Sequence, residues 1–338
     1  MLGRIVRWID AFQQRHAVLG FPHAVIKKFG EDRGGQQATL LAYYGFFSLL
    51  PLLLVAVTVL GFVLRDNPDL RERLLDSAIS QFPVIGEHIR DSLHSIEGSS
   101  LALAIGLVGA FWGGLGGIRA MQDAMNVVWD VPHRERPGFP NRLLPALLML
   151  LILGGFALVS TALSAIAAGG GGGVEGLARA ITIPGSIILN VVTFLLAFKV
   201  LTTKGVSWRD VFPGAVVAGV AWAGLQAAGT YIVGSRLEGA SQLYGVFGIV
   251  IGLVLWLYLG AQVTLLAAEV NVVRKYRLWP RAIDMGNLTG TDREALGRRA
   301  RVEERVKGQR ISVSFEDANK GSDADEGSDR EPNAGKVD

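Results

Sequence analysis

The chain alternates between long stretches without charged side chains and shorter connections that carry most of its Lys, Arg, Asp and Glu residues. An α-helix rises about 1.5 Å per residue, so roughly 20 apolar residues cross the ~30 Å hydrocarbon core of a bilayer. Six uncharged stretches reach or approach that length, and they predict transmembrane helices at about 38–64, 99–118, 143–168, 180–200, 211–235 and 243–268. The predicted fold class is therefore all-α: a polytopic membrane protein with six transmembrane helices and a membrane domain over 34–272.

Composition supports a membrane protein, because 50% of the 338 residues are hydrophobic and 19% are charged, whereas soluble domains carry nearer a quarter charged residues. The chain has no Cys, which excludes disulfides, thiolate metal sites and a cysteine nucleophile. All five His residues lie outside the apolar stretches, and the two in segment 65–98, His88 and His94, are six residues apart, which is the wrong spacing for two ligands on one helical face. We expect no metal site, no cofactor and no catalytic residue.

Orientation follows from the basic residues, because Lys and Arg near the spans are retained on the cytoplasmic side. The N-terminal segment, the tail and the connections on their side carry 27 of the 33 Lys and Arg residues, and the other connections carry 6. The sequence therefore predicts that both termini lie in the cytoplasm.

Three segments flank the predicted spans. In segment 1–33, apolar residues including Trp8 and Phe12 share one helical stripe, which fits a helix on an anionic leaflet or one packed against the membrane domain. Segment 65–98 repeats apolar residues at three- and four-residue spacing and predicts an outer helical loop. The charged tail, 273–338, is expected to be cytoplasmic and largely disordered, with a short amphipathic helix near lipid headgroups as the alternative for its basic stretch, 292–310.

The first span is too polar for a passive anchor. Its hydroxyl groups and a helix-breaking proline fit either a substrate path or contacts that hold helices together, and both interpretations remain open. Polar side chains in the last span are weaker candidates of the same kind. The substrate-pathway candidates are Tyr43, Tyr44, Ser48, Pro51, Tyr244 and Gln262.

A second polar group is expected at the inner ends of the spans. Arg119, Asp123 and Asn126 follow one another at three- to four-residue spacing, so they share a face of a continuing helix. We interpret them as part of an inner gate, with a structural clamp between helix ends as the alternative. The other inner-gate candidates are Trp129, Glu269 and Asn271.

Three motifs carry a family resemblance. The run from Ala42-Tyr43-Tyr44 through Phe47-Ser48-Leu49-Leu50-Pro51, the Asn126-x-x-Trp129 element and the Ala268-Glu269-x-Asn271 exit resemble the YihY/BrkB family of bacterial inner-membrane proteins. The resemblance covers roughly residues 20–275. It implies six spans, cytoplasmic termini and a bacterial plasma membrane. Members of the family carry ribonuclease and virulence labels and suggestions of a role in lipid or envelope-precursor transport.

The residue types in the sequence narrow the classes of function that the protein can have. A ribonuclease needs a metal cluster or a poised His pair, and neither pattern is visible in the sequence, so we expect no enzyme and no nucleic-acid partner. The preferred function is a transporter or envelope-lipid handling factor whose partners are membrane lipids, such as an anionic lipid or envelope precursor. A non-transporting membrane scaffold is the alternative, and a ribonuclease is the remote one.

Overall fold

A computed structural model of the chain describes residues 2–63, 100–138, 140–141, 143–169, 175–203, 205–283, 286 and 288–315. The predicted outer loop 65–98 and the end of the tail, 316–338, lie outside these residues. Within the described part every regular element is helical, in agreement with the all-α prediction.

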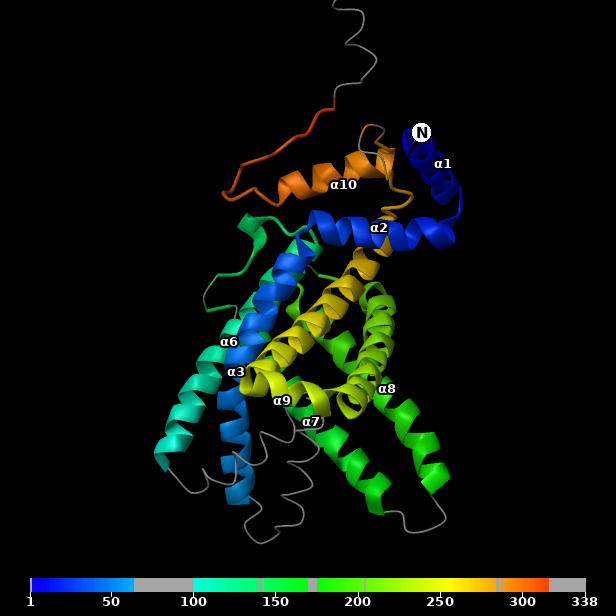
Figure 1. Cartoon of the computed structure of the whole chain (residues 1–338). Helices are drawn as coiled ribbons and strands as arrows, with labels where there is room; N and C mark the ends of the chain where they lie inside the picture. Colours follow the sequence, from blue (N-terminus) through cyan, green and yellow to red (C-terminus); the bar gives the residue numbers. More distant parts are fainter. Residues whose placement is uncertain are drawn as a thin grey trace, which may run out of the picture.

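Figure 1 shows a bundle of long helices with a layer of shorter ones across one end. We call that layer, made of α1, α2, segment 277–283, α10 and the segment 302–310 that follows it, the charged cap. The elements in chain order are α1 (Leu2–Arg15), α2 (Ala17–Glu31), α3 (Gly34–Val63), α6 (Ser100–Val128), the 3₁₀ turn η1 (His133–Glu135), α7 (Leu143–Gly169), α8 (Glu175–Leu201), α9 (Trp208–Tyr276) and α10 (Gly290–Arg301).

Small residues bring the bundle helices into close contact. α3 packs against α6 and α9, while α8 packs between α7 and α9. A Cβ added at Gly113 of α6 would lie 2.9 Å from the Cα of Ser48 in α3, and one at Gly219 would lie 2.9 Å from the backbone N of Val191 in α8. The backbones are therefore close because these positions lack side chains, as expected where packing replaces hydrophobic burial.

Three described segments are long and apolar enough to cross a membrane: Pro184–Leu201, Trp208–Gly229 and Val250–Tyr276. Helices α3, α6 and α7, at 30, 29 and 27 residues, occupy the first three predicted spans. Many of their large apolar side chains are exposed, including Trp112 at 81% and Leu151 at 72%. Such exposure suits a lipid environment. The total of six spans and the orientation stay predictions.

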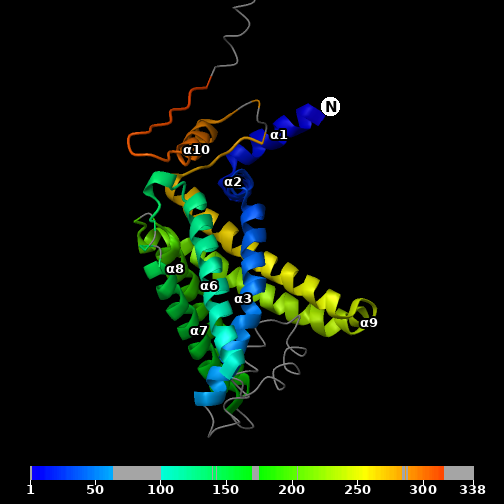
Figure 2. The ribbon, with the colours of Figure 1, turned by 90° about the vertical axis from the view of Figure 1, so that its left-hand side faces the viewer.

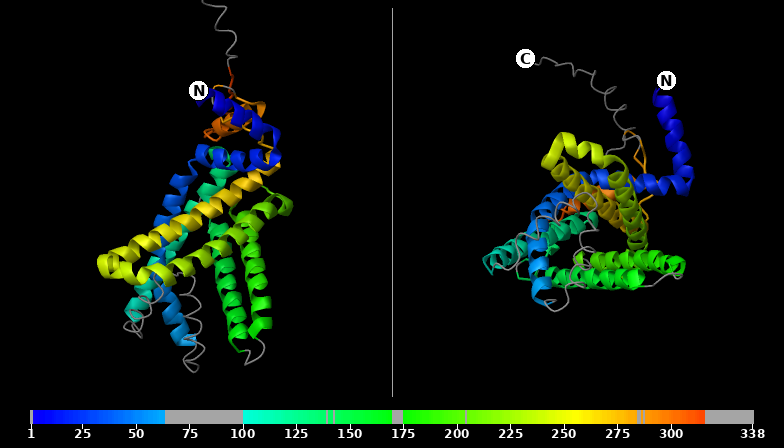
Figure 3. Two further views of the ribbon diagram at one scale, coloured as in Figure 1. Left: turned by 45° about the vertical axis from the view of Figure 1, so that its right-hand side comes forward. Right: turned by 60° about the horizontal axis from the view of Figure 1, so that its bottom comes forward.

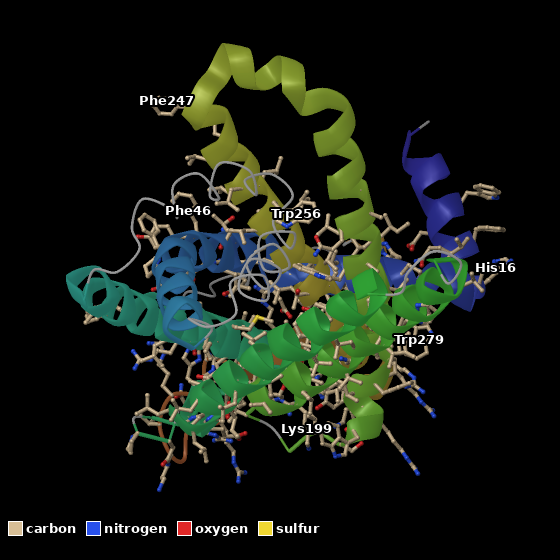
Figure 4. The ribbon with its side chains drawn as sticks, turned by 90° about the horizontal axis from the view of Figure 1, so that it is seen from below. His16, Phe46, Lys199, Phe247, Trp256 and Trp279 are labelled. Atoms are coloured by element: carbon tan, nitrogen blue, oxygen red, sulfur yellow. The ribbon has the colours of Figure 1, made fainter. Side chains whose placement is uncertain are left out.

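Helix α9 differs from the sequence-based expectation of two spans joined by an outer connection at 236–238. It is one helix of 69 residues that bends back on itself, so that its ends meet (Figure 3). A straight helix of this length would extend about 100 Å, yet Lys275 Nζ lies 2.7 Å from the Asp210 carboxylate. Phe247, 79% exposed, lies near the bend (Figure 4), and both arms run aslant to α3 and α6 (Figure 2). The charged residues Arg236 and Glu238 were the reason to expect a connection between two spans, but the backbone stays helical through both positions.

Part of the charged tail is helical, since α9 continues to Tyr276 and α10 (Gly290–Arg301) overlaps the basic stretch 292–310, for which a short helix was the alternative. A capping box at Thr289 and Asp292 starts α10, and Asp292 is fully buried. Asp292 accepts hydrogen bonds from Arg281 Nε at 2.5 Å, Lys27 Nζ at 2.8 Å and the Ala282 backbone N at 2.9 Å. Composition suggested disorder because the segment is highly charged, but its charges pair with cap residues more than 200 positions away in sequence.

Candidate functional site

A cluster of buried charges lies where the cap meets the bundle. We call Lys28, Asp32, Asp130 and Glu269 the inner cluster. Lys28 Nζ is 2.5 Å from Asp32 Oδ2, 3.3 Å from Glu269 Oε2 and 3.6 Å from Asp130 Oδ1, and it donates to the Val128 carbonyl at 2.9 Å. All four side chains are almost completely buried. One ammonium group therefore faces three carboxyl groups in a site shielded from water.

The four members of the inner cluster come from three elements. Lys28 and Asp32 are one turn apart at the end of α2, so their side chains share a face. Asp130 follows the end of α6 with φ of 50°, a left-handed conformation that Asp tolerates better than most residues. Glu269 lies on the second arm of α9. The cluster thus joins α2, α6 and α9.

Burial and neighbouring charges set the titration behaviour on the cap side. Burial raises the pKa of the Asp32 carboxyl above its ordinary value, although Lys28 opposes the shift. Burial alone lowers the pKa of Lys28, but the three facing carboxyl groups outweigh it and raise that pKa. Lys28 is therefore a permanent cation, and any proton exchange within the cluster involves its carboxyl groups.

Helix α10 contributes two further cations from the cap. Arg298 Nε lies 3.2 Å from Asp130 Oδ2 and stacks over the Tyr276 ring at 3.4 Å. Arg299 lies 3.7 Å from Asp32 and is more exposed, with 37% of its side chain accessible. The docked tail thus supplies compensating charge to a cluster whose carboxyl groups outnumber its lysine.

The predicted inner-gate residues fall into two places, and four of them lie at the ends of α6 and α9 that face the charged cap. Glu269 belongs to the inner cluster, and the buried Trp129 ring packs edge-on against Tyr276, with ring centroids 6.4 Å apart. Asn126 is buried in the last turns of α6. Asn271 Oδ1 accepts from the Gly214 backbone N at 2.6 Å and so ties the two arms of α9 together.

The other two inner-gate residues, Arg119 and Asp123, lie in what we call the lateral groove between α3 and α6. Its deeper part is a pocket of about 520 Å³ whose lining includes Tyr44 and Trp112. An adjoining pocket of about 870 Å³ shares Arg119 and Asp123. Leu40, 44% exposed, also lines both pockets. The groove combines apolar walls with charged groups.

The remaining pathway candidates lie apart from the inner cluster. Tyr43 is 55% exposed and contacts the Phe47 ring, whereas Ser48 is buried and bonds the Gly45 carbonyl. Pro51 lies against Gly109 of α6. Gln262 donates to the Tyr258 hydroxyl at 2.8 Å. Tyr244 is within helix α9, but its side chain lies outside the described residues.

Lys28, Asp32 and Asp130 were not predicted as site residues. The i,i+4 spacing of Lys28 and Asp32 was a weak signal, and Asp130 directly follows the Asn126-x-x-Trp129 element. Among the described residues no three His or carboxylate side chains are arranged to hold a metal ion. The expectation that the protein uses no cofactor stays a prediction.

The fold and the site define a helical membrane protein whose apolar bundle is closed at one end by a charged cap and a buried charge cluster. The comparisons give its family: residues 25–284 match the family model described as virulence factor BrkB. This range covers most of the chain, and the chain therefore belongs to the BrkB family, as the resemblance to YihY/BrkB proteins predicted.

Curated relatives agree with this assignment. The chain is 27% identical to an uncharacterised protein of Dickeya dadantii, over 79% of this chain and 86% of that one. It is 22% identical to the inner membrane protein YhjD of Escherichia coli, over 79% and 85% of the two chains. It is 23% identical to a ribonuclease-like protein, YfkH, of Bacillus subtilis, over 75% and 95%. No solved structure matches the chain.

Proposed function

We propose that this protein handles an anionic lipid or envelope precursor in the bacterial inner membrane, and that the lateral groove binds the lipid headgroup. The observation that carries the proposal is the position of Arg119, an exposed cation among apolar groove residues. A charged side chain facing lipid costs free energy unless it reaches the interface or pairs with an anion. A lipid phosphate would supply that anion.

The lining of the groove supports an amphiphilic ligand. Trp112 precedes Arg119 by seven residues on α6, about 10 Å along the helix axis. The lateral groove therefore has an apolar end at Trp112 and a charged end at Arg119. At the charged end Arg119 and Arg136 face Asp123, which leaves a formal excess of one positive charge. This arrangement favours a negatively charged headgroup with its acyl chain along Trp112 and Leu40.

Orientation is part of the proposal. We place the charged cap in the cytoplasm, with both termini on that side and six membrane crossings. Support comes from the excess of Lys and Arg in the segments on the cap side. Under this orientation the headgroup end of the groove lies toward the inner leaflet.

Native mass spectrometry of the protein in nanodiscs made with mixed phospholipids tests the proposal. We expect an anionic phospholipid to be enriched over the surrounding bilayer, and Arg119→Gln to lower its binding roughly 10-fold, because a charge-assisted hydrogen bond is worth about 1.5–3 kcal/mol. Arg209→Gln is the matched control, since Arg209 is exposed on α9 and does not line the groove. Equal lipid binding by both variants would overturn the proposal and favour the scaffold alternative.

A further inference from the structure

Glu269 is the least compensated member of the inner cluster. Its side chain is fully buried, and within the described part of the chain neither carboxyl oxygen accepts a hydrogen bond. Lys28 Nζ, at 3.3 Å, is its ion-pair partner there. That ammonium group is closer to Asp32 and to the Val128 carbonyl, at 2.5 and 2.9 Å. An ionised Glu269 would therefore be a buried carboxylate without a hydrogen-bond donor, which is costly.

The charges around Glu269 can be counted element by element. From α2 come Lys28 and Asp32, from the end of α6 comes Asp130, and from α10 come Arg298 and Arg299. Arg298 compensates Asp130, and Arg299 is partly exposed, so solvent screens its charge. The other charged pair on this part of α2, Lys27 and Glu31, is committed to Asp292 and Arg281. Lys28 is left as the buried cation for two carboxyl groups.

Those two carboxyl groups converge on one ammonium group, because Lys28 Nζ lies 2.5 Å from Asp32 Oδ2 and 3.3 Å from Glu269 Oε2, and they lie within hydrogen-bonding reach of each other. Two ionised carboxylates repel and can only accept hydrogen bonds, whereas a pair sharing one proton gains a donor. One proton also balances the excess negative charge beside Lys28. We propose that Asp32 and Glu269 form a proton-binding site that holds one exchangeable proton between them.

A path for exchange lies on the cap side. A pocket of about 560 Å³ between α10 and the first turns of α3 is lined by Asp32, Arg33, His133 and Arg299, among others. Asp32 lines this pocket with the small part of its side chain that is exposed, whereas Glu269 does not line it. The site thus exchanges its proton with the aqueous phase on the cap side, and Arg299 of the docked tail stands at the entrance. This inference does not depend on the proposed lipid function.

Infrared spectroscopy of the full chain in nanodiscs tests the proposal, because a protonated carboxyl group absorbs separately from a carboxylate. We expect a carboxylic C=O band that persists above the pH range in which Asp and Glu side chains ordinarily ionise and disappears as the pH rises further. Glu269→Gln should abolish that titrating band, since the amide keeps the shape of the side chain without a titratable proton. Glu303→Gln is the matched control, because Glu303 is 61% exposed and pairs with Arg305 at the surface.

Two results would overturn the proposal: no titrating carboxylic band in the unchanged chain, or the same band in Glu269→Gln. A second variant covers the case in which Glu269→Gln does not fold. Arg299→Gln removes a partly exposed cation at the entrance, so we expect the midpoint of the band to rise by about half a pH unit. A midpoint that is unchanged or lower would count against an Asp32–Glu269 proton. The lipid-binding measurement above is independent of all these outcomes.

Discussion

At the scale of single residues, Lys28 is a buried cation that compensates the charge of three buried carboxyl groups. Its ammonium group contacts carboxyl groups from α2, the end of α6 and α9, and it also holds the last carbonyl of α6. Buried ion pairs add little net stability when they are complete, but removing one partner leaves an uncompensated charge. The packing of α2, α6 and α9 against one another therefore depends on Lys28, because it compensates the negative charges that these helices bring together.

Lys28→Met should destabilise the folded protein by about 3–5 kcal/mol at neutral pH, because it leaves buried carboxylates unpaired. Burial raises the folded-state pKa of the Asp32 carboxyl above its unfolded value, and without the lysine no cation at a comparable distance in the described structure opposes that shift. The penalty for ionised Asp32 is then absent at low pH and grows as pH rises, so the variant should be relatively more stable near pH 5 than near pH 8. Thermal unfolding in detergent at both pH values measures this effect.

The matched control for that experiment is Lys307→Met, since Lys307 is an exposed lysine of the cap. Its stability should stay within about 0.5 kcal/mol of the unchanged protein. If Lys28→Met unfolded at the same temperature as this control at neutral pH, the compensating role of Lys28 would be excluded.

Gly214 supports a second prediction at this scale. A Cβ added there would lie 2.2 Å from the Ala267 carbonyl oxygen and 2.4 Å from Asn271 Nδ2. Gly214→Ala should therefore push the arms of α9 apart and cost about 1–3 kcal/mol, despite the better helix propensity of Ala. Gly224→Ala, on the same arm with no atom within 4 Å, should be neutral or slightly stabilising. Thermal unfolding compares the pair, and equal stability would show that the arms are free to separate.

Sequence patterns identified one side of the inner cluster and missed the other. Glu269 was noticeable because it is a charge directly after a long apolar run, and Asn126 and Trp129 were noticeable as parts of a motif. Lys28 and Asp32 lie in a segment with many charges, where sequence does not distinguish a buried pair from a solvated one. Lys28 and Asp32 are buried because α9 and α10 pack against α2, and the contacting residues of those helices lie more than 200 positions away in sequence.

At the scale of elements, hydropathy predicted which stretches of the helices are apolar but not the residues at which the helices begin and end. The last two predicted spans are arms of the single helix α9, and the charged tail contains α10. In both cases the sequence signal was local charge, which reports polarity rather than backbone conformation. Long-range pairs decide the outcome: Lys275 with Asp210 closes α9, and Arg281 with Asp292 and Glu31 fixes the tail.

Asp292→Asn should release α10 from the cap. The carboxylate accepts bonds from α2, from segment 281–282 and from its own N-cap, and an amide cannot pair with Lys27 and Arg281 as an anion does. Hydrogen exchange across 277–301 should rise by at least tenfold, consistent with a loss of about 3 kcal/mol of docking energy. Glu294→Gln, an exposed position on α10, should leave exchange unchanged, and equal protection in both variants would refute this role of Asp292.

The same carboxylate predicts a pH dependence. Although burial opposes it, the hydrogen bonds from Lys27, Ala282 and Arg281 lower the pKa of Asp292 well below its ordinary value. A lowered folded-state pKa contributes stability that is present above the unfolded value, about 4, and is lost as pH falls below it. Docking of α10 should therefore weaken below about pH 4 in the unchanged chain. Asp292→Asn should show no such acid step.

At the scale of the whole molecule, the buried and paired charges are concentrated at one end of the bundle. The cap, the inner cluster and α10 gather at one end, while exposed apolar side chains cover α7, α8 and α9. This arrangement has one orientation consistent with the Lys and Arg distribution, in which the cap is cytoplasmic. The bend of α9 lies beside the bundle, and both of its arms run aslant to α3 and α6 (Figure 2).

The absence of Cys from the sequence allows a direct test with single cysteines and a membrane-impermeant maleimide. Arg305→Cys, on the cap with 70% of the Arg305 side chain exposed, should react only after cells are permeabilised. Gly172→Cys, in the predicted outer connection between α7 and α8, should react in intact cells. Reaction of the two positions from the same side would contradict the predicted orientation, because an odd number of crossings separates them.

A third position decides whether α9 crosses the membrane twice, which Arg305 and Gly172 cannot do. If both arms cross, Glu238 near the bend lies outside, and Glu238→Cys should react in intact cells. If α9 enters and returns without crossing, α8 still separates Gly172 from Arg305, but Glu238→Cys should then be buried in lipid and react poorly from either side. The first outcome supports six crossings, and the second would reduce the number to four and make α9 a re-entrant element.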